Sequence, residues 1–294
     1  MKSERSLTIG EGRFMTRDCL SLWYRVAGRG PTLLVPTPGW GASVDMYMKS
    51  LKPLEQKFSL IYLDTRGAGR SEAPATASGY AFANFIYDLE TLRVNLGLDR
   101  WLIFAHSDAS RQAMEYAIEY PKACRGLFIV GGTTGIQDKA YNDDLAKRQK
   151  KLSHECWYSA AEKADNSTPK SDDEFRQSFL YVALPMYFAS YDAAVEARHY
   201  FSASTYHIKA FKYDDFAPEF PREKLAEIRV PTAVFVGDQD VITTPFDAHR
   251  IHRGITKSRP FTIKNAGHFP WLQQPKTFFK CFAQAAREIL RARP

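Results

Sequence analysis

The stretch "IFAHSDASRQ", residues 103–112, places a serine between a histidine and an aspartate, where an apolar run meets a helix-like segment. A strand, a sharp turn that carries a serine and then a helix is an arrangement that exposes the hydroxyl as a nucleophile. The start of the helix adds amide donors and a partial positive charge for a developing anion. Glycines usually flank such a serine, whereas Ala105 and Ala109 stand there in this chain. Ser107 is therefore a candidate nucleophile that needs partners elsewhere.

The rest of the chain alternates short apolar runs with helix-length segments, which predicts an α/β fold. The expected strands are residues 20–27, 32–36, 60–64, 101–105, 126–130, 232–240 and 261–268. The expected helices are residues 82–98, 110–121 and 277–290, of which the last is amphipathic. Continuous apolar runs such as 60–64 are typical of strands that are covered on both faces. We therefore expect a mostly parallel sheet with helices on both faces.

The alternation breaks between residues 137 and 222, where helix-like polar segments and many aromatic residues surround a loop-like stretch at 163–174. It resumes at 232 with strand-like sequence. The pattern predicts two parts: a core formed by residues 1–136 and 223–294, and an inserted helical cap at 137–222. An insertion after the strand at 126–130 would lie over Ser107 as a lid.

Two later segments offer partners for Ser107. His268 lies in "NAGHFPW", after the last expected strand, and "VGDQDVITTP" at 236–245 supplies Asp238 and Asp240 at the end of the preceding strand. Sheets of this class place their sites at the carboxyl ends of the strands. The order serine, acid, histidine is the order in which one group of α/β folds carries its catalytic triad.

Several segments together resemble the α/β-hydrolases, and most closely the proline-iminopeptidase-like branch. They are "PTPGWGASVDMY" (36–47), "LDTRGAGRSEAP" (63–74), "AHSDAS" (105–110), "VPTAVFVGDQDVITTP" (230–245) and "AGHFPWLQQP" (266–275). The resemblance implies an α/β-hydrolase fold with Ser107 as nucleophile, His268 as base and Asp240 as acid. Asp238 is the reserve choice for the acid. No cofactor and no metal are implied.

The resemblance also implies an oxyanion hole made of the backbone N–H groups of Asp108 and of the loop at 39–41, at Trp40. Pro38 stands where the family usually has a histidine, but backbone amides carry this function. Aromatic residues of the expected cap favour an apolar or aromatic substrate. The candidate substrate-binding residues are Trp40, Trp157, Tyr187 and Phe188. The "DTRGAGRS" segment is interpreted as structural.

These features predict a serine hydrolase that acts through an acyl-enzyme on a small to medium ester, lactone or amide. Two alternatives stay open. An aminopeptidase of the proline-iminopeptidase type would need cap carboxylates to hold a free amine, and no spacing singles out a pair. A lyase, cyclase or ligand-binding protein on the same fold is suggested by the altered serine turn and by Asp108, whose charge would oppose an alkoxide if it pointed inward.

Composition sets the remaining expectations. The net charge of +7 arises from 40 basic and 33 acidic residues that are interspersed, and no nucleic-acid-binding motif is evident. The four cysteines are widely spaced, which favours reduced thiols. Neither an apolar leader nor an apolar run of about 20 residues is present. We therefore expect a cytoplasmic monomer or homodimer that binds a small-molecule substrate and neither nucleic acid nor a membrane.

Overall fold

The computed structural model describes residues 7–38, 41–211 and 218–292 of the chain. In this part, strands form one eight-stranded sheet in the order β1-β2-β4-β3-β5-β6-β7-β8. Neighbouring strands from β4 to β8 pair in parallel, whereas β1 and β2 are antiparallel to their neighbours. The strands are β1 (Gly10–Met15), β2 (Ser21–Ala27), β3 (Thr32–Pro36), β4 (Ser59–Leu63), β5 (Trp101–His106), β6 (Cys124–Val130), β7 (Thr232–Gly237) and β8 (Ser258–Ile263). The mostly parallel sheet is the expected one.

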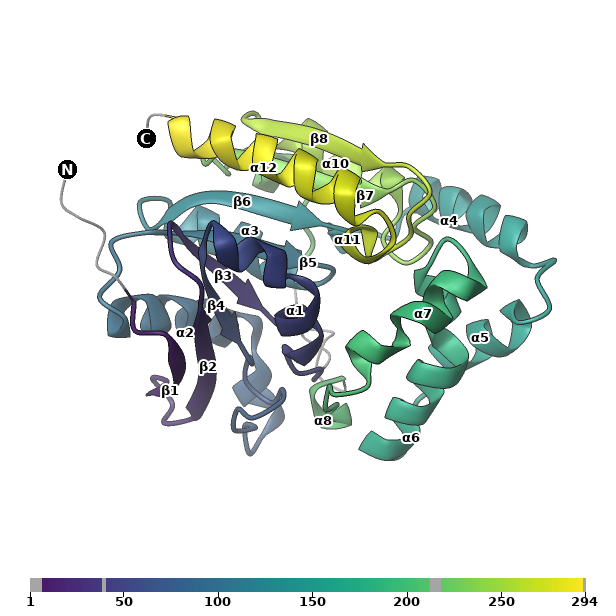
Figure 1. The fold of residues 1–294 in the computed structure, drawn as a ribbon, viewed down its shortest axis with the longest axis horizontal. Helices are drawn as coiled ribbons and strands as arrows, with labels where there is room; N and C mark the ends of the chain where they lie inside the picture. Colours follow the sequence, from purple (N-terminus) through teal and green to yellow (C-terminus); the bar gives the residue numbers. More distant parts are fainter. Residues whose placement is uncertain (1–6, 39–40, 212–217, 293–294) are drawn as a thin grey trace.

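Helices cover both faces of the sheet, as Figure 1 shows. The core helices are α1 (Asp45–Ser50), α2 (Phe82–Asn95), α3 (Ala109–Glu119), α10 (Pro245–Gly254), α11 (Pro270–Gln273) and α12 (Pro275–Arg291), with the short helices η1 (Lys52–Gln56) and η2 (Ala77–Tyr80). Helices α1 and α12 pack on one face, and α2, α3 and α10 on the other. The observed α2, α3 and α12 match the three helices predicted from periodicity to within three residues at each end.

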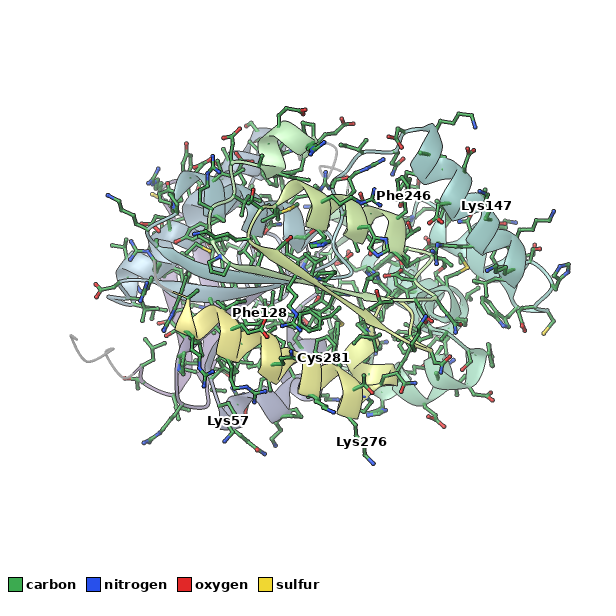
Figure 2. The ribbon with its side chains drawn as sticks, turned by 90° about the horizontal axis from the view of Figure 1, so that it is seen from above. Lys57, Phe128, Lys147, Phe246, Lys276 and Cys281 are labelled. Atoms are coloured by element: carbon green, nitrogen blue, oxygen red, sulfur yellow. The ribbon has the colours of Figure 1, made fainter. Side chains whose placement is uncertain are left out.

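In the continuous apolar strands, alternate residues pack into two separate hydrophobic cores, one on each face of the sheet. In β5, Leu102 and Phe104 join one core, whereas Ile103 and Ala105 join the other. Side chains of a strand point to opposite faces in turn, so a strand covered on both sides must be apolar throughout. On the first face, Phe128 lies under α12 (Figure 2) and stacks on Phe282 with ring centroids 4.3 Å apart.

The segment between β6 and β7 forms further helices beside the carboxyl end of the sheet (Figure 1). They are α4 (Lys139–Leu152), α5 (Tyr158–Asp165), α6 (Asp172–Ser178), the π-helical η3 (Phe179–Ala183), η4 (Leu184–Tyr187), α7 (Tyr191–Phe201), α8 (Ile208–Phe211) and α9 (Arg222–Leu225). We refer to α4 to α8 as the cap helices. The loop expected at 163–174 is shorter, because α5 runs to Asp165 and Ser171 caps α6 by accepting from Glu174 N at 3.1 Å. The boundaries at 137 and 222 stay a prediction.

The "DTRGAGRS" segment ties loops together through ion pairs, of which Arg66–Asp88 is buried. Arg66, which is 2% exposed, donates from Nε to Asp88 at 2.7 Å and from Nη1 to Asp18 at 2.9 Å. Arg70 donates to Asp64 at 3.0 Å and to Asp45 at 2.6 Å. These contacts hold the loop after β4 against the turn between β1 and β2, against α2 and against α1. They agree with the structural interpretation of this motif.

The strand β1 was not expected from the sequence. Only Phe14 of its residues is buried, and the strand pairs with β2 at the edge of the sheet. In the described part of the chain, no helix is both long and apolar enough to cross a bilayer.

Candidate active site

Ser107 lies at the turn between β5 and α3 with a φ of 57°, in the left-handed region that non-glycine residues rarely adopt. Such a backbone costs about 1–3 kcal/mol and persists only where the surroundings enforce it. The turn is fastened to the next strand, because Ser107 N donates to Val130 O at 3.0 Å. Ala105 and Ala109, at the two flanking positions, are fully buried. The structure thus forms the sharp serine turn with alanine methyl groups packed beneath it.

His268 and Asp240 form a buried pair. His268 Nδ1 lies 2.9 Å from Asp240 Oδ2, and both side chains are 0% exposed. The other oxygen of Asp240 accepts from the backbone N–H groups of Ile242 at 2.8 Å and Thr243 at 3.1 Å. Asp238 points elsewhere, toward Ala266 N and the Lys264 ammonium. The geometry therefore separates the two aspartates and joins only Asp240 to the histidine.

The far side of the His268 ring is unpaired. Nε2 is buried and has no hydrogen-bond partner among the described residues, Ser107 included. Two contacts bring this ring to the serine turn: His106, the residue before Ser107, bonds to His268 O at 2.9 Å, and their ring centroids are 4.5 Å apart. Gly131 is the residue that follows β6. It lies so close to the imidazole that a Cβ added to it would be 3.1 Å from His268 Nδ1.

Thr243 is a member of the site that the sequence reading missed. Its hydroxyl is 2.7 Å from Gly131 O, 3.2 Å from Asp240 Oδ2 and 3.2 Å from His268 Nδ1. A hydroxyl carries one proton, and the shortest contact, to the carbonyl, takes it. The Thr243 oxygen then accepts from His268 Nδ1–H beside Asp240. "VITTP" contained this residue, but only the fold brings its hydroxyl to the imidazole.

His106 is a second residue whose role the sequence did not reveal. Its Nε2 faces the carbonyl of His268, which can only accept, so Nε2 carries the proton. Its Nδ1 then accepts from the Tyr47 hydroxyl at 2.8 Å. Burial, and secondarily His268, lower the pKa of His106 well below its ordinary value, which agrees with this neutral tautomer. His106 thus anchors the loop that presents His268.

Asp108 pairs with a neighbouring cation. Its Oδ1 accepts from Arg111 Nε at 2.5 Å, one turn along α3, and also contacts Arg111 Nη2. The Asp108 carboxylate is thus neutralised by a basic side chain of α3. The backbone N–H of Asp108 donates to no acceptor in the described ranges. Trp40, the other predicted oxyanion residue, lies outside the described residues.

Of the four candidate substrate-binding residues, Trp40 lies outside the described residues, and the other three differ in position. The Tyr187 ring lies edge-on to His268 with centroids 5.6 Å apart, and Tyr187 O accepts from His268 N at 2.8 Å. Phe188 is 2% exposed and packs on the rings of Phe201 and Phe269. Trp157 is partly buried and packs with Tyr158 in a small cluster that Tyr187 also contacts. Of the three, the structure brings Tyr187 to the catalytic histidine candidate.

A cap carboxylate lies near the same histidine. The Tyr187 hydroxyl donates to Asp165 Oδ1 at 2.8 Å, and His268 is close enough to affect the Asp165 carboxyl electrostatically. Asp165 remains accessible to solvent, yet burial among surrounding atoms raises its pKa above the usual value. This combination is expected of a carboxylate that lines a concave surface. The sequence offered many cap carboxylates and no reason to choose this one.

Comparison with known proteins identifies the family. A family model described as the alpha/beta hydrolase fold matches residues 32–275. A proline iminopeptidase from Saccharolobus solfataricus is 24% identical over 86% of this chain and 84% of its own length. A putative carbamate hydrolase from Escherichia coli is 22% identical over 89% of this chain and 93% of its own.

Solved structures share the fold. An esterase from Exiguobacterium antarcticum has a TM-score of 0.72 at 18% identity, with 95% of this chain and 100% of that chain covered. An enol-lactonase from Burkholderia xenovorans has a TM-score of 0.66 at 18% identity, with 94% and 100% covered. Three observations indicate the same fold family: the sheet, the serine turn at the end of β5 and the family match over most of the chain. The chain therefore belongs to the α/β-hydrolase superfamily, and it is a hydrolase of that fold.

Proposed function

We propose that this hydrolase is a serine hydrolase that acts through an acyl-enzyme on a small to medium, apolar or aromatic ester, lactone or amide. The observation that carries the proposal is the buried His268–Asp240 pair. The Nε2 of His268 is unpaired in the described chain, and its ring packs on His106, the residue before Ser107, whose φ is 57°. Such a serine, histidine and carboxylate form the general base arrangement of nucleophilic catalysis. Relatives named esterase, enol-lactonase and carbamate hydrolase perform or are assigned reactions of this class.

The first half of the reaction follows from the hydrogen bonds. Asp240 and Thr243 accept from His268 Nδ1–H, which leaves Nε2 as the basic nitrogen. Nε2 takes the Ser107 proton while Oγ attacks the substrate carbonyl carbon. The oxyanion is stabilised by Asp108 N–H and by the loop amide that we assign to Trp40. His268 then returns its proton to the leaving group as the C–O or C–N bond breaks.

Water completes the cycle. His268 Nε2 accepts a proton from water, the resulting hydroxide oxygen attacks the acyl carbon, and Ser107 Oγ leaves as it regains the proton. The imidazolium that forms in each step is stabilised by the Asp240 carboxylate. Two backbone N–H groups donate to the Asp240 side chain and hold it in place beside the imidazole.

The proposal is tested by labelling with a fluorophosphonate and by turnover of aryl esters. Wild type should lose activity as one label attaches to Ser107, and Ser107→Ala should neither label nor turn over substrate. His268→Ala should reduce kcat by about a thousandfold or more. Turnover by Ser107→Ala equal to that of wild type would instead favour the lyase, cyclase or binding alternative.

A second candidate function, an aminopeptidase, is favoured by one observation. Asp165, held by Tyr187 and electrostatically coupled to His268, places a carboxylate where it could pair with a substrate ammonium. The relative from Saccharolobus solfataricus is named a proline iminopeptidase. Wild type and Asp165→Asn should be compared on an aminoacyl-naphthylamide and on a neutral aryl ester. A selective rise in KM for the aminoacyl substrate supports this candidate, and equal effects on both substrates contradict it.

A further inference from the structure

A cavity lies at the opposite end of the sheet from Ser107. It has a volume of about 400 Å³ and is formed where β5, β6, β7 and β8 begin. Figure 1 shows this end of the sheet far from α4 to α7, beside the final turn of α12. Its lining combines the buried Cys124 and Val230 with the cationic side chains of Arg100, Lys122, Arg125, Arg229 and Lys257. Among the residues that the structure describes, no acidic one lines it.

Four of these cations lack ion-pair partners. Arg100, Lys122, Arg229 and Lys257 are exposed, and none of them contacts an acidic side chain within the described ranges. Exposed cations elsewhere in the described chain include paired ones, such as Lys139 with Asp143 at 2.7 Å, and unpaired ones, such as Lys147. What distinguishes these four is that they line one cavity. Like charges that share one small cavity repel one another, and a bound anion relieves that repulsion.

The backbone that carries these side chains is held rigidly. Trp101 N, next to Arg100, donates to Ala123 O at 3.0 Å, and Thr232 N donates to the carbonyl of Lys257 at 2.9 Å. Leu127 N donates to Pro231 O at 3.0 Å, which ties the start of β6 to the segment after Arg229. The four cations therefore project from strand starts whose relative positions are fixed, which reduces the ordering cost of binding.

The negative ends of the neighbouring helix dipoles do not neutralise the positive charge around the cavity. Helices α2, α3, α10 and α12 end at this side of the sheet, since each runs antiparallel to the strands. Each helix C-terminus carries about −0.5 elementary charge, so the four ends together supply about −2. The four unpaired side chains alone exceed that value about twofold. An excess of positive charge remains for a ligand.

We propose that this cavity is a binding site for a small, multiply charged phosphoryl anion of the pyrophosphate class. The volume accommodates a few phosphoryl groups, and the cations converge on one cavity instead of forming the extended stripe that would follow a nucleic acid. Arginine and lysine are the side chains that bind phosphoryl oxygens. The site is independent of the proposed Ser107 chemistry.

Isothermal titration calorimetry with inorganic pyrophosphate, at fixed ionic strength, tests the proposal. The test variant is Arg229→Gln/Lys257→Gln. The matched control is Lys147→Gln/Lys150→Gln, which removes the same charge from the exposed face of α4, where Figure 2 shows Lys147 pointing outward. Wild type and control should bind one pyrophosphate per chain with Kd values within about twofold, and the test variant should bind about tenfold or more weakly.

Three results would overturn the proposal. They are the absence of saturable binding by wild type up to about 10 mM pyrophosphate, an equal loss in test and control variants, and binding of anionic vesicles or single-stranded oligonucleotide that pyrophosphate does not displace. This third result would mean that the surface binds a macromolecule instead of a small phosphoryl anion. Thermal melting of both variants checks folding, and the single substitutions Arg229→Gln and Lys257→Gln replace the double variant if it does not fold. Ser107→Ala should bind pyrophosphate as wild type does.

Discussion

At the scale of single residues, Ser107 combines a strained backbone with a buried position. The φ of 57° is stabilised by Ser107 N bonding to Val130 O and by the packing of Ala105 and Ala109. Strain at such a position is maintained at the expense of stability, and functional sites are where it is usually found. The replacement of both flanking glycines by alanine does not prevent the turn from forming.

This strain predicts the stability of two Ser107 variants. Ser107→Gly removes the Cβ that conflicts with a positive φ, whereas Ser107→Ala keeps it. We expect the glycine variant to be about 1 kcal/mol more stable than the alanine variant, because relief of strain exceeds the added entropy of the unfolded chain. Both should be inactive. Urea unfolding of the two proteins measures the difference, and a less stable glycine variant would contradict the strain.

The Asp108–Arg111 pair predicts a second effect on activity. Arg111→Gln leaves the Asp108 carboxylate beside the proposed oxyanion without its guanidinium partner. We expect kcat/KM for an aryl ester to fall roughly tenfold, since an unpaired negative charge opposes the forming oxyanion. Asp108→Asn/Arg111→Gln should recover most of that loss. If the double variant is no faster than Arg111→Gln, the pair acts through structure and not through charge.

At the scale of elements, the loop after β4 is fixed by an ion pair that titrates at low pH. Arg66 lowers the pKa of Asp18 to about 2, and Thr16 assists by donating to it at 2.6 Å. A lowered folded-state pKa stabilises the fold above the unfolded-state pKa of about 4, and this contribution disappears as the pH falls from about 4 to about 2. Asp18 is 42% exposed, so salt screens the contribution.

The measurement compares wild type with Asp18→Asn. The melting temperature of wild type should exceed that of the variant by a constant amount from pH 8 to pH 5, and the difference should vanish near pH 2. Glu227→Gln is the control, because Glu227 is exposed and has no ion-pair partner in the parts of the chain that the structure describes. A difference between wild type and Asp18→Asn that persists unchanged at pH 2 would exclude the titration of Asp18 as its cause.

Buried strands and helices could be predicted from the sequence better than the exposed edge strand β1. Apolar runs that serve two cores, such as β5, leave a strong signal in composition, and the same holds for the apolar stripe of α12. The edge strand β1 buries only Phe14, so its pairing with β2 leaves little trace in the pattern. Likewise, Asp240 and His268 could be predicted because they follow strand ends in a known order, whereas Thr243 and His106 act through tertiary contacts that no local pattern encodes.

At the scale of the whole molecule, one aromatic cluster supports the sheet beneath α12. Phe282 is fully buried and stacks on Phe128, and it also contacts the rings of Phe58 and Phe104. Removal of such a ring loses its transfer free energy and leaves a cavity. Phe282→Ala should therefore lower the free energy of unfolding by about 3–5 kcal/mol, measured by denaturant titration.

The control for this prediction is Val94→Ala. Val94 is 61% exposed on α2, and its truncation should change stability by less than about 0.5 kcal/mol. A small effect of Phe282→Ala, comparable with that of Val94→Ala, would show that the cluster repacks around the vacancy.

The bond from His268 N to Tyr187 O has a consequence for how the cap helices affect the site. The imidazole loop is fastened to the cap at 2.8 Å, and an added Cβ on Gly267 would lie 2.7 Å from the same carbonyl. A displacement of the cap helices that kept this hydrogen bond would move His268 relative to Asp240. The position of the cap helices and the geometry of the proposed triad are thus linked through a contact that does not involve Ser107.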